Sequence, residues 1–250
     1  MKPALSQLYS EKELASIDPE CVPNHIAVVM DGNRRWAQQN GSSIEMGHYQ
    51  GAEQLDLIIR AAAEIGIKAL TVYSFSTENW KRSKQEVETL MKLLQTYLVN
   101  KRETLIQEGV SLHAIGDISG LPVHLQEELK ATIEATQNGK RIDLILALNY
   151  GGRDEVRRAM IKMSEAVDKG DLNWSSVTEN TISSYLDTAP WPDPDLLIRP
   201  SGVKRLSNFL IWQISYCEIV ITDVLWPDFS PKDLLKSVLE YQGRQRRFGG

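Results

Sequence analysis

The sequence is poor in cysteine and has no long apolar run. Its only cysteines, Cys21 and Cys217, lie far apart and form no CxxC pair, so we expect neither a disulfide framework nor a cysteine zinc site. No apolar segment reaches the ~18 residues of a membrane-spanning helix. Residues 1–20 are polar and contain no apolar signal-peptide core. The simplest prediction is a cytoplasmic protein.

Several motifs of common enzyme classes are also missing. The sequence has no GxxxxGK[ST] phosphate loop, no GxGxxG after a strand and no HExxH zinc motif. Its net charge of -5 gives no overall attraction to nucleic acid or to an anionic membrane, so we expect no nucleic-acid partner. An anionic substrate would therefore have to be bound by a local cluster of cations.

Short apolar runs and amphipathic segments alternate along the chain. We expect strands at 25–30, 69–75, 111–115, 143–148, 196–199 and 218–222, and helices at 47–65, 121–136, 153–169 and 178–186, with a last helix capped by Ser230. This alternation predicts an α/β fold with a central, mostly parallel sheet flanked by helices. No repeat or linker divides the chain, so residues 1–22 are interpreted as a lead-in segment and 23–250 as a single domain.

A further amphipathic helix is predicted after Ser83. Ser83 can cap this helix, and Glu86 has the spacing of its capping-box partner. The apolar stripe of this helix comprises Val87, Leu90, Met91, Leu94, Tyr97 and Leu98. By itself such a stripe indicates packing against a core.

Unusual polar residues follow the predicted strands. Ligands of parallel α/β sheets bind outside the carboxyl ends of the strands, where Asp31, Ser76 and Arg199 fall, with Asn79 shortly after. In the segment MDGNRRWA at 30–37, two arginines stand where the chain turns into a helix, an arrangement that suits phosphate. Asp31 would repel phosphate unless Mg²⁺ bridges the two. A solvated Asp-Gly turn explains these residues equally well.

Other polar clusters are less specific on their own. The loop 74–82 combines hydroxyls, an amide and cations, and 199–209 contains three cations and two serines, as a second diphosphate site would. His48 could donate to phosphate or relay a proton. Glu218 adjoins an apolar run and needs a metal or an arginine as partner. Capping loops, charged surface loops and an ordinary salt bridge remain the alternatives.

Together and in order, these segments resemble the cis-prenyltransferase family. The matching segments are MDGNRRWA at 30–37, GHYQG at 47–51, FSTENWKR at 75–82, NYGGR at 149–153, DLLIR at 195–199, RLSNFLIWQ at 205–213, TDVLWPDF at 222–229 and RRFGG at 246–250. The aspartate-rich DDxxD motif of trans-prenyltransferases is absent. The resemblance extends from about Pro23 to the last residue.

This resemblance implies a fold and an activity. The fold would be that of undecaprenyl diphosphate synthase, which is not a Rossmann fold, with a homodimer and an apolar tunnel walled by the 87–98 stripe. The enzyme would use Mg²⁺ to condense isopentenyl diphosphate repeatedly onto an allylic diphosphate such as farnesyl diphosphate. The product would be a long polyprenyl diphosphate such as undecaprenyl diphosphate, the carrier-lipid precursor of cell-wall synthesis. Its greasy product would bring only peripheral membrane contact.

The resemblance also implies residue roles. Asp31 and Asn79 would be catalytic, and Asp31 and Glu218 would hold Mg²⁺. The allylic substrate would be bound by Gly32, Asn33, Arg34, Arg35, Trp36, His48, Ser76, Thr77, Glu78, Trp80 and Arg82, with Glu86 in support. Isopentenyl diphosphate would be bound by Arg199, Arg205 and Ser207, and by Arg247 and Gly249 of a neighbouring subunit.

The sequence departs from the family pattern at three positions. Val203 stands where many members have glutamate, Ile44 where many have arginine, and Arg34 where bacterial members commonly have glycine. Val203 cannot ligate a metal or pair with an arginine, so one supporting carboxylate is missing, and Ile44 removes one expected contact to the allylic diphosphate. They leave open a non-catalytic partner subunit of the same fold, although such subunits typically lack the aspartate that is present here as Asp31. An unrelated Mg²⁺-dependent phosphohydrolase is a third reading.

Overall fold

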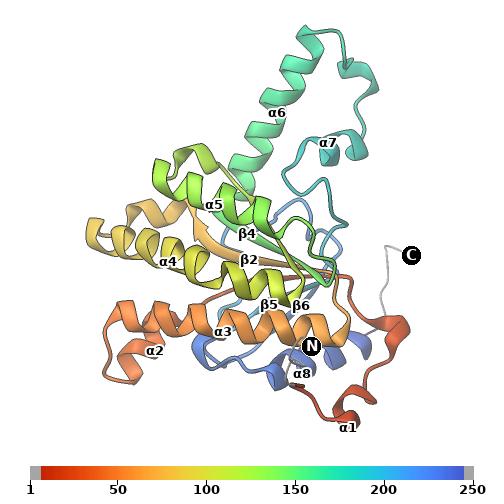
Figure 1. The fold of residues 1–250 in the computed structure, drawn as a ribbon. Helices are drawn as coiled ribbons and strands as arrows, with labels where there is room; N and C mark the ends of the chain where they lie inside the picture. The colour runs from red at the N-terminus through yellow and green to blue at the C-terminus, as the bar shows by residue number, and fades with distance from the viewer. Residues whose placement is uncertain (1–6, 245–250) are drawn as a thin grey trace.

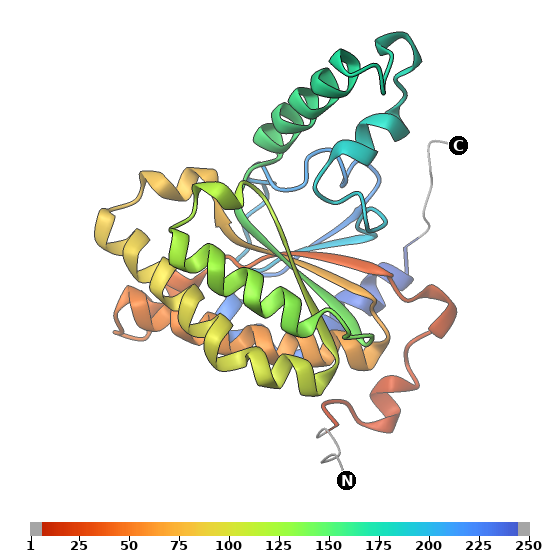
Figure 2. The ribbon, with the colours of Figure 1, turned by 45° about the horizontal axis from the view of Figure 1, so that its top comes forward.

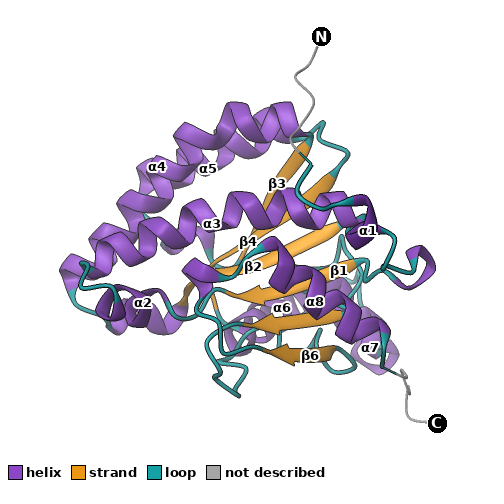
Figure 3. Cartoon of the chain, turned by 90° about the horizontal axis from the view of Figure 1, so that it is seen from below, coloured by secondary structure: helices purple, strands orange, loops and turns teal. Residues whose placement is uncertain are grey.

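The computed structural model describes residues 7–244, and a parallel sheet runs through its centre. Its strands are β1 (His25–Val29), β2 (Ala69–Ser76), β3 (Val110–Ile115), β4 (Ile142–Tyr150), β5 (Leu196–Arg199) and β6 (Glu218–Ile221). Figure 1 shows the sheet between the helices. The strand order is β3-β4-β2-β1-β5-β6 and every neighbouring pair is parallel, as the alternating pattern predicted (Figure 3). The chain leaves β1 towards β2 but later returns to β5 on its other side, so a crevice is expected between β1 and β5.

All the predicted helices are present, with boundaries shifted by no more than three residues. The helices are α1 (Glu11–Leu14), α2 (Asn33–Gln39), α3 (Ile44–Ile65), α4 (Lys84–Glu108), α5 (Val123–Thr136), α6 (Gly152–Asp168), α7 (Glu179–Tyr185) and α8 (Pro231–Gln242). Helix α3 begins three residues earlier than the sequence suggested, because the Ser43 hydroxyl accepts a hydrogen bond from the Met46 amide. None of the helices within 7–244 combines the length and hydrophobicity needed to cross a bilayer.

The two faces of the sheet are covered differently. Helices α3, α4, α5 and α8 pack on one face and form the larger apolar core (Figure 3). On the other face the irregular segment 205–217 packs three buried residues, Phe209, Leu210 and Ile214, against the strands. Helices α6 and α7 lie on that side, and α6 projects away from the body of the molecule (Figure 2). In the part of the chain that the structure describes, no helix covers the carboxyl ends of β1, β2 and β5, where a cleft opens among the loops that follow these strands.

One of the two predicted helix caps is only half formed. Ser83 accepts from the Glu86 amide at 3.3 Å, as expected. The Glu86 carboxylate does not bond back to Ser83, however, because it binds Arg82 at 2.8 Å. The cap at Ser230 is confirmed, since its amide donates to the Asp233 carboxylate at 2.8 Å. Glu86 is therefore used for holding an arginine rather than for starting its helix.

His25 gives the fold a dependence on pH. Its ring is fully buried, with Nδ1 donating to the Pro192 carbonyl and Nε2 accepting from the Thr71 hydroxyl, both at 2.7 Å. Burial lowers the pKa of His25 below its usual 6.5, although the bond to Pro192 opposes this shift. The native state therefore favours the neutral ring.

We expect the free energy of unfolding to fall as the pH is lowered from 7.5 to 5. The unfolded chain takes up a proton on His25 near pH 6.5, whereas the folded protein resists it, so this stabilisation is complete above 6.5 and is lost below it. Urea unfolding across this range measures the slope, and the His25→Asn variant should show a shallower one. Equal slopes in the two proteins would contradict this role of His25.

Candidate functional site

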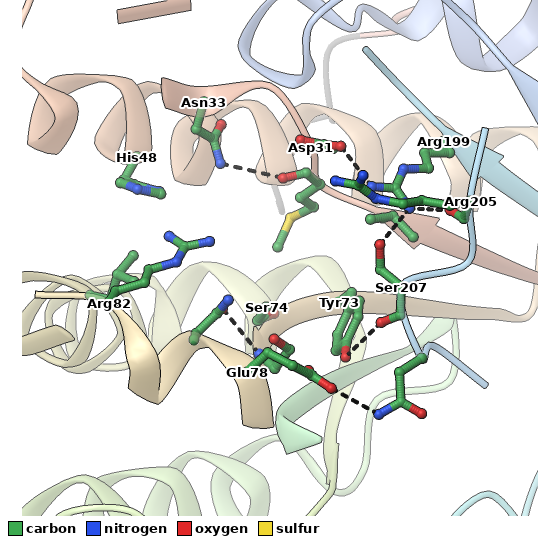
Figure 4. A pocket seen from close by; sticks show the side chains of 16 residues that line it. Asp31, Asn33, His48, Tyr73, Ser74, Glu78, Arg82, Arg199, Arg205 and Ser207 are labelled. Carbon is green, nitrogen blue, oxygen red and sulfur yellow. Dashed lines mark hydrogen bonds and ion pairs between the residues drawn. The ribbon is translucent and has the colours of Figure 1, made fainter. Parts of the chain in front are cut away.

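A polar cleft opens where β1, β2 and β5 end. It has a volume of about 590 Å³. Its lining includes Asp31, Asn33, His48, Tyr73, Ser74, Ser76, Glu78, Asn79, Arg82, Arg199, Arg205, Ser207 and Asn208. Ten of the predicted site residues therefore lie around one cavity, and Figure 4 shows the side chains that line it from close by.

Asp31 and Arg199 form the central ion pair of this cleft. Arg199 is almost completely buried and donates to the Asp31 carboxylate at 2.8 Å (Figure 4). Burial raises the pKa of Asp31, but the hydrogen bond and charge of Arg199, aided by Arg35 at 3.5 Å, hold that pKa below its usual value. Asp31 is therefore ionised at neutral pH and partly accessible, as a metal-binding carboxylate must be.

The loop that carries Asp31 is held by the segment 222–229. The Trp226 amide donates to the Asp31 carbonyl at 3.0 Å. Gly32 has a φ of 114°, and a Cβ there would lie 3.0 Å from Leu225, so the turn requires glycine. The Trp36 ring nitrogen donates to Asp228 at 2.8 Å. Trp36 thus anchors the loop from outside the cleft.

The Glu86 carboxylate binds two arginines on the wall of the cleft opposite Arg199. It is buried and binds Arg82 at 2.8 Å and Arg34 at 3.4 Å. Arg34, Arg35 and Arg82 line a recess of about 260 Å³ that adjoins the main cleft. Two arginines fixed by one buried carboxylate leave excess positive charge facing this recess, which suits a diphosphate.

His48 lies beside this arginine cluster and is neutral. Burial first, and the charge of Arg82 second, lower the pKa of His48 to about 4. The 3.9 Å approach of His48 to Glu86 is therefore not an ion pair at neutral pH. Its buried Nε2 atom has no hydrogen-bond partner. An unsatisfied polar atom at the wall of a cleft is available to a ligand.

Close packing of α3 on α2 sets the position of His48. A Cβ on Gly47 would lie 2.3 Å from the Asn33 carbonyl oxygen, and one on Gly51 would lie 2.4 Å from the Asn33 side-chain oxygen. Only glycine permits this approach at either position. The GHYQG motif is thus explained by packing around His48 as well as by His48 itself.

The loop η2 (Thr77–Lys81) forms the floor of the cleft. The Asn79 side chain accepts from the Ser76 amide at 3.1 Å, which fixes the turn. Trp80 donates to Asn149 at 2.7 Å and packs edge-on against Phe75. Trp80 therefore fastens the loop to β4, whereas Ser76 and Asn79 line the cavity.

The segment after β5 closes the remaining side. Arg199 donates to the Ser207 hydroxyl at 3.0 Å and also to the Arg205 carbonyl. The Arg205 side chain is exposed and lines the cleft. Val203 and Ile44, where the family pattern has charged residues, are only partly exposed.

An apolar cavity of about 90 Å³ adjoins the cleft. It shares Met30, Asn33, His48, Ser74 and Leu90 with the cleft. Its remaining lining comes mainly from α3 and α4 and includes Leu55, Met91, Leu93, Leu94 and Tyr97. The 87–98 stripe thus contributes a cavity wall as well as core residues. A polar cleft that continues into an apolar cavity suits a ligand with an anionic head and an apolar body.

One predicted metal ligand, Glu218, lies away from the cleft. Glu218 begins β6, at the end of the strands opposite to Asp31, and binds Arg244 at 2.7 Å. Arg247 and Gly249 lie outside the described residues. Within 7–244 no group of three or more potential metal ligands is present. In this single chain, Asp31 is therefore separated from Glu218.

The structure adds residues that the sequence analysis did not single out. Tyr73 stacks on Phe209 with ring centroids 4.4 Å apart, and the Tyr73 hydroxyl donates to the Tyr150 carbonyl at 3.1 Å. Asn208 binds Glu78 at 3.0 Å. The NYGGR and RLSNFLIWQ segments contain Tyr150, Asn208 and Phe209, whereas Tyr73 lies in none of the matching segments. Only the fold shows that these residues meet.

Comparisons with known proteins show which proteins this chain resembles. A family model described as "Putative undecaprenyl diphosphate synthase" matches residues 29–249. An isoprenyl transferase of Heliobacterium mobile is 48% identical over 94% of this chain and 90% of its own length. One from Shouchella clausii is 45% identical over 96% of this chain and 93% of its own.

Two solved structures share the fold. Lavandulyl diphosphate synthase from Lavandula x intermedia, solved in complex with dimethylallyl diphosphate, has a TM-score of 0.90 and 38% identity over 92% of this chain and all of its own. A probable undecaprenyl diphosphate synthase from Campylobacter jejuni has a TM-score of 0.77 and 34% identity over 91% of this chain and 99% of its own.

We expect His48 to titrate far below neutral pH. NMR of the ring nitrogens should give a pKa of about 4 in the wild-type protein. In the Arg82→Met variant this pKa should rise, because Arg82 lowers it and its removal also leaves the nearby Glu86 carboxylate less compensated. A wild-type value near 6.5 would show that His48 is neither buried nor close to these arginines.

Proposed function

The chain belongs to the undecaprenyl diphosphate synthase family of isoprenyl transferases, and on this basis we propose that it is a Mg²⁺-dependent cis-prenyl chain-elongating synthase. It adds isopentenyl diphosphate repeatedly to an allylic diphosphate, with farnesyl diphosphate as primer. The product is a long polyprenyl diphosphate such as undecaprenyl diphosphate. The observation that carries this proposal is the polar, arginine-rich cleft that continues into an apolar cavity.

The residues of the cleft fit a Mg²⁺ ion that arrives with a substrate. Asp31 is ionised and partly accessible, and Mg²⁺ commonly takes one or two carboxylates together with waters and substrate phosphates. A closed cage of protein ligands is not required for such a site. When bound, the metal would neutralise charge that develops on the diphosphate leaving group. Asp31 would hold it. Glu218 of the same chain lies at the opposite end of the strands, so a glutamate at this position could take part only from a second copy of the chain.

The chain's own residues supply the rest of the chemistry. Arg34, Arg35 and Arg82 bind the allylic diphosphate and stabilise it as it leaves. Arg199, Arg205 and Ser207 hold isopentenyl diphosphate on the other side of Asp31. Fixing both substrates in one cleft lowers the entropic cost of their encounter.

The remaining polar groups lie near the point where the two substrates meet. His48, neutral and with an unsatisfied ring nitrogen, can bond to a diphosphate oxygen or accept a proton. Asn79 and Ser76 lie on the cavity floor. The prenyl chain extends into the apolar cavity between α3 and α4, away from the water of the cleft.

Asp31 and the apolar cavity each argue against one of the two alternative functions, a non-catalytic partner subunit and a phosphohydrolase. A non-catalytic partner subunit has no need of an ionised aspartate paired with a buried arginine, whereas this chain retains both. A phosphohydrolase has no need of an apolar cavity that opens from the anion site. Both readings predict different products from the synthase, so one assay distinguishes the three.

We expect purified protein with Mg²⁺, farnesyl diphosphate and labelled isopentenyl diphosphate to form long prenyl products, sized by chromatography. Asp31→Ala should lower turnover by roughly 10³, because it removes the metal-binding carboxylate and leaves Arg199 unpaired. The matched control is Asp171→Ala, at an exposed turn after α6. Undiminished elongation by Asp31→Ala would refute the role of Asp31. Phosphate release without prenyl product would favour a hydrolase, and turnover only with a second protein would favour a partner subunit.

We also propose that the protein is a homodimer that associates through β6. This strand is at the edge of the sheet, and Ile219 and Ile221 on it are 39% and 37% exposed. An accessible edge strand with apolar side chains is a common interface between copies of a chain. The same arrangement would bring a second copy close to Glu218, which begins β6.

We expect sedimentation of the wild-type protein to give a dimer and that of Ile221→Glu to give a monomer, since burying a carboxylate at the interface is unfavourable. Val123→Glu is the matched control, because Val123 is 68% exposed on α5, away from β6. A wild-type monomer, or an Ile221→Glu protein that remains dimeric, would refute this interface.

A further inference from the structure

Asn208 connects three parts of the molecule that are distant in sequence. Its side-chain amide donates to Glu78 at 3.0 Å, a bond drawn as a dashed line from Glu78 in Figure 4. Its side-chain oxygen accepts from the Arg153 amide at 3.0 Å, and its backbone carbonyl accepts from the Gly152 amide at 2.7 Å. Glu78 belongs to the η2 loop, and the two amides begin α6.

The two ends of the Asn208 side chain cannot exchange roles. The Arg153 amide can only donate, and the Glu78 carboxylate can only accept when it is ionised. Burial raises the pKa of Glu78, but the Asn208 bond and other hydrogen bonds hold it below its usual value, so Glu78 is ionised. Asparagine, with one donor and one acceptor, matches both partners.

Asn208 acts as the missing cap of α6. The residue that precedes this helix is Gly151, which has no side chain and so cannot cap it. Asn208 supplies the acceptors from a segment more than fifty residues later. A Cβ on Gly151 would lie 2.7 Å from the Asn208 amide nitrogen and 2.7 Å from the Thr77 hydroxyl. The glycine therefore allows the two loops to meet.

The backbone around Asn208 adopts a conformation that most residues avoid. Ser207, Asn208 and Leu210 have φ angles of 53°, 62° and 44°. Asparagine tolerates this region better than serine or leucine does. Phe209, which is fully buried against Tyr73, and the bonds of Asn208 hold the turn in place. The turn presents the Ser207 hydroxyl to Arg199 at 3.0 Å.

We propose that Asn208 is a positioning residue that couples the two diphosphate-binding sides of the cleft. Through Glu78 it holds the loop that carries Asn79, and through the adjacent Ser207 it sets the segment that faces Arg199. This inference rests on the proposed function, because it assigns the two sides to the two substrates.

The test uses a donor–acceptor exchange. Asn208→Asp keeps the acceptors for α6 and tolerates the same backbone conformation, but it removes the donor and places a second carboxylate against Glu78. Glu78→Gln combined with Asn208→Asp restores one donor and one acceptor in the reverse direction. Asn138→Asp, at an exposed position after α5, is the control for the charge change.

Turnover and substrate dependence give the first measurement. We expect Asn208→Asp to lower kcat/KM for isopentenyl diphosphate about tenfold and the double variant to recover most of it, which is the coupling expected of residues in contact. Asn138→Asp should match the wild type. No loss in Asn208→Asp, or a loss that the double variant does not recover, would overturn the proposal.

Hydrogen exchange gives a second measurement that needs no turnover. The backbone amides of 76–82 should exchange faster in Asn208→Asp and return to the wild-type rate in the double variant. If the wild type forms no prenyl product, the proposed function fails, and the exchange rates still decide the coupling. Unchanged exchange in Asn208→Asp would refute the contact between the two loops.

Discussion

The ion pair between Asp31 and Arg199 is the interaction on which the site depends. It joins the ends of β1 and β5, the neighbouring strands between which the strand order switches direction, and it links residues 168 positions apart. A nearly buried arginine requires a nearby anion, and Asp31 supplies it while remaining partly accessible. The pair therefore keeps a cation fixed in the cleft and holds the Asp31 carboxylate ionised.

The rest of the site can be understood as charge arranged around this pair. Glu86 holds Arg34 and Arg82 on one wall, and Arg205 and Ser207 adjoin Arg199 on the other. Excess arginine leaves the cleft attractive to diphosphates although the whole chain has a net charge of -5. The apolar cavity beside the cleft offers a place for the apolar prenyl chain of a substrate whose diphosphate lies in the polar cleft.

Much of the fold was accessible from the sequence, and less of the site geometry. Every strand and helix predicted from short apolar runs and amphipathic spacing is present in the structure, because these patterns depend on residues that are close in sequence. The polar residues at strand ends led to the cleft because parallel strands bring their carboxyl ends together. The capping-box role of Glu86 was wrong, since its carboxylate binds Arg82, four residues earlier, and Arg34 from α2. The predicted strand 218–222 already placed Glu218 at the amino end of its strand, and the structure confirms this position.

The sequence by itself determined the α/β class, the parallel sheet, the family and many of the residues around the cleft. Tertiary structure alone decided which of these residues touch: Asp31 with Arg199, Glu78 with Asn208, and Gly51 with Asn33. The physical reason is that hydrophobic periodicity and turn chemistry are local. Ion pairs and close backbone approaches join segments whose separation in the chain says nothing about their distance in space.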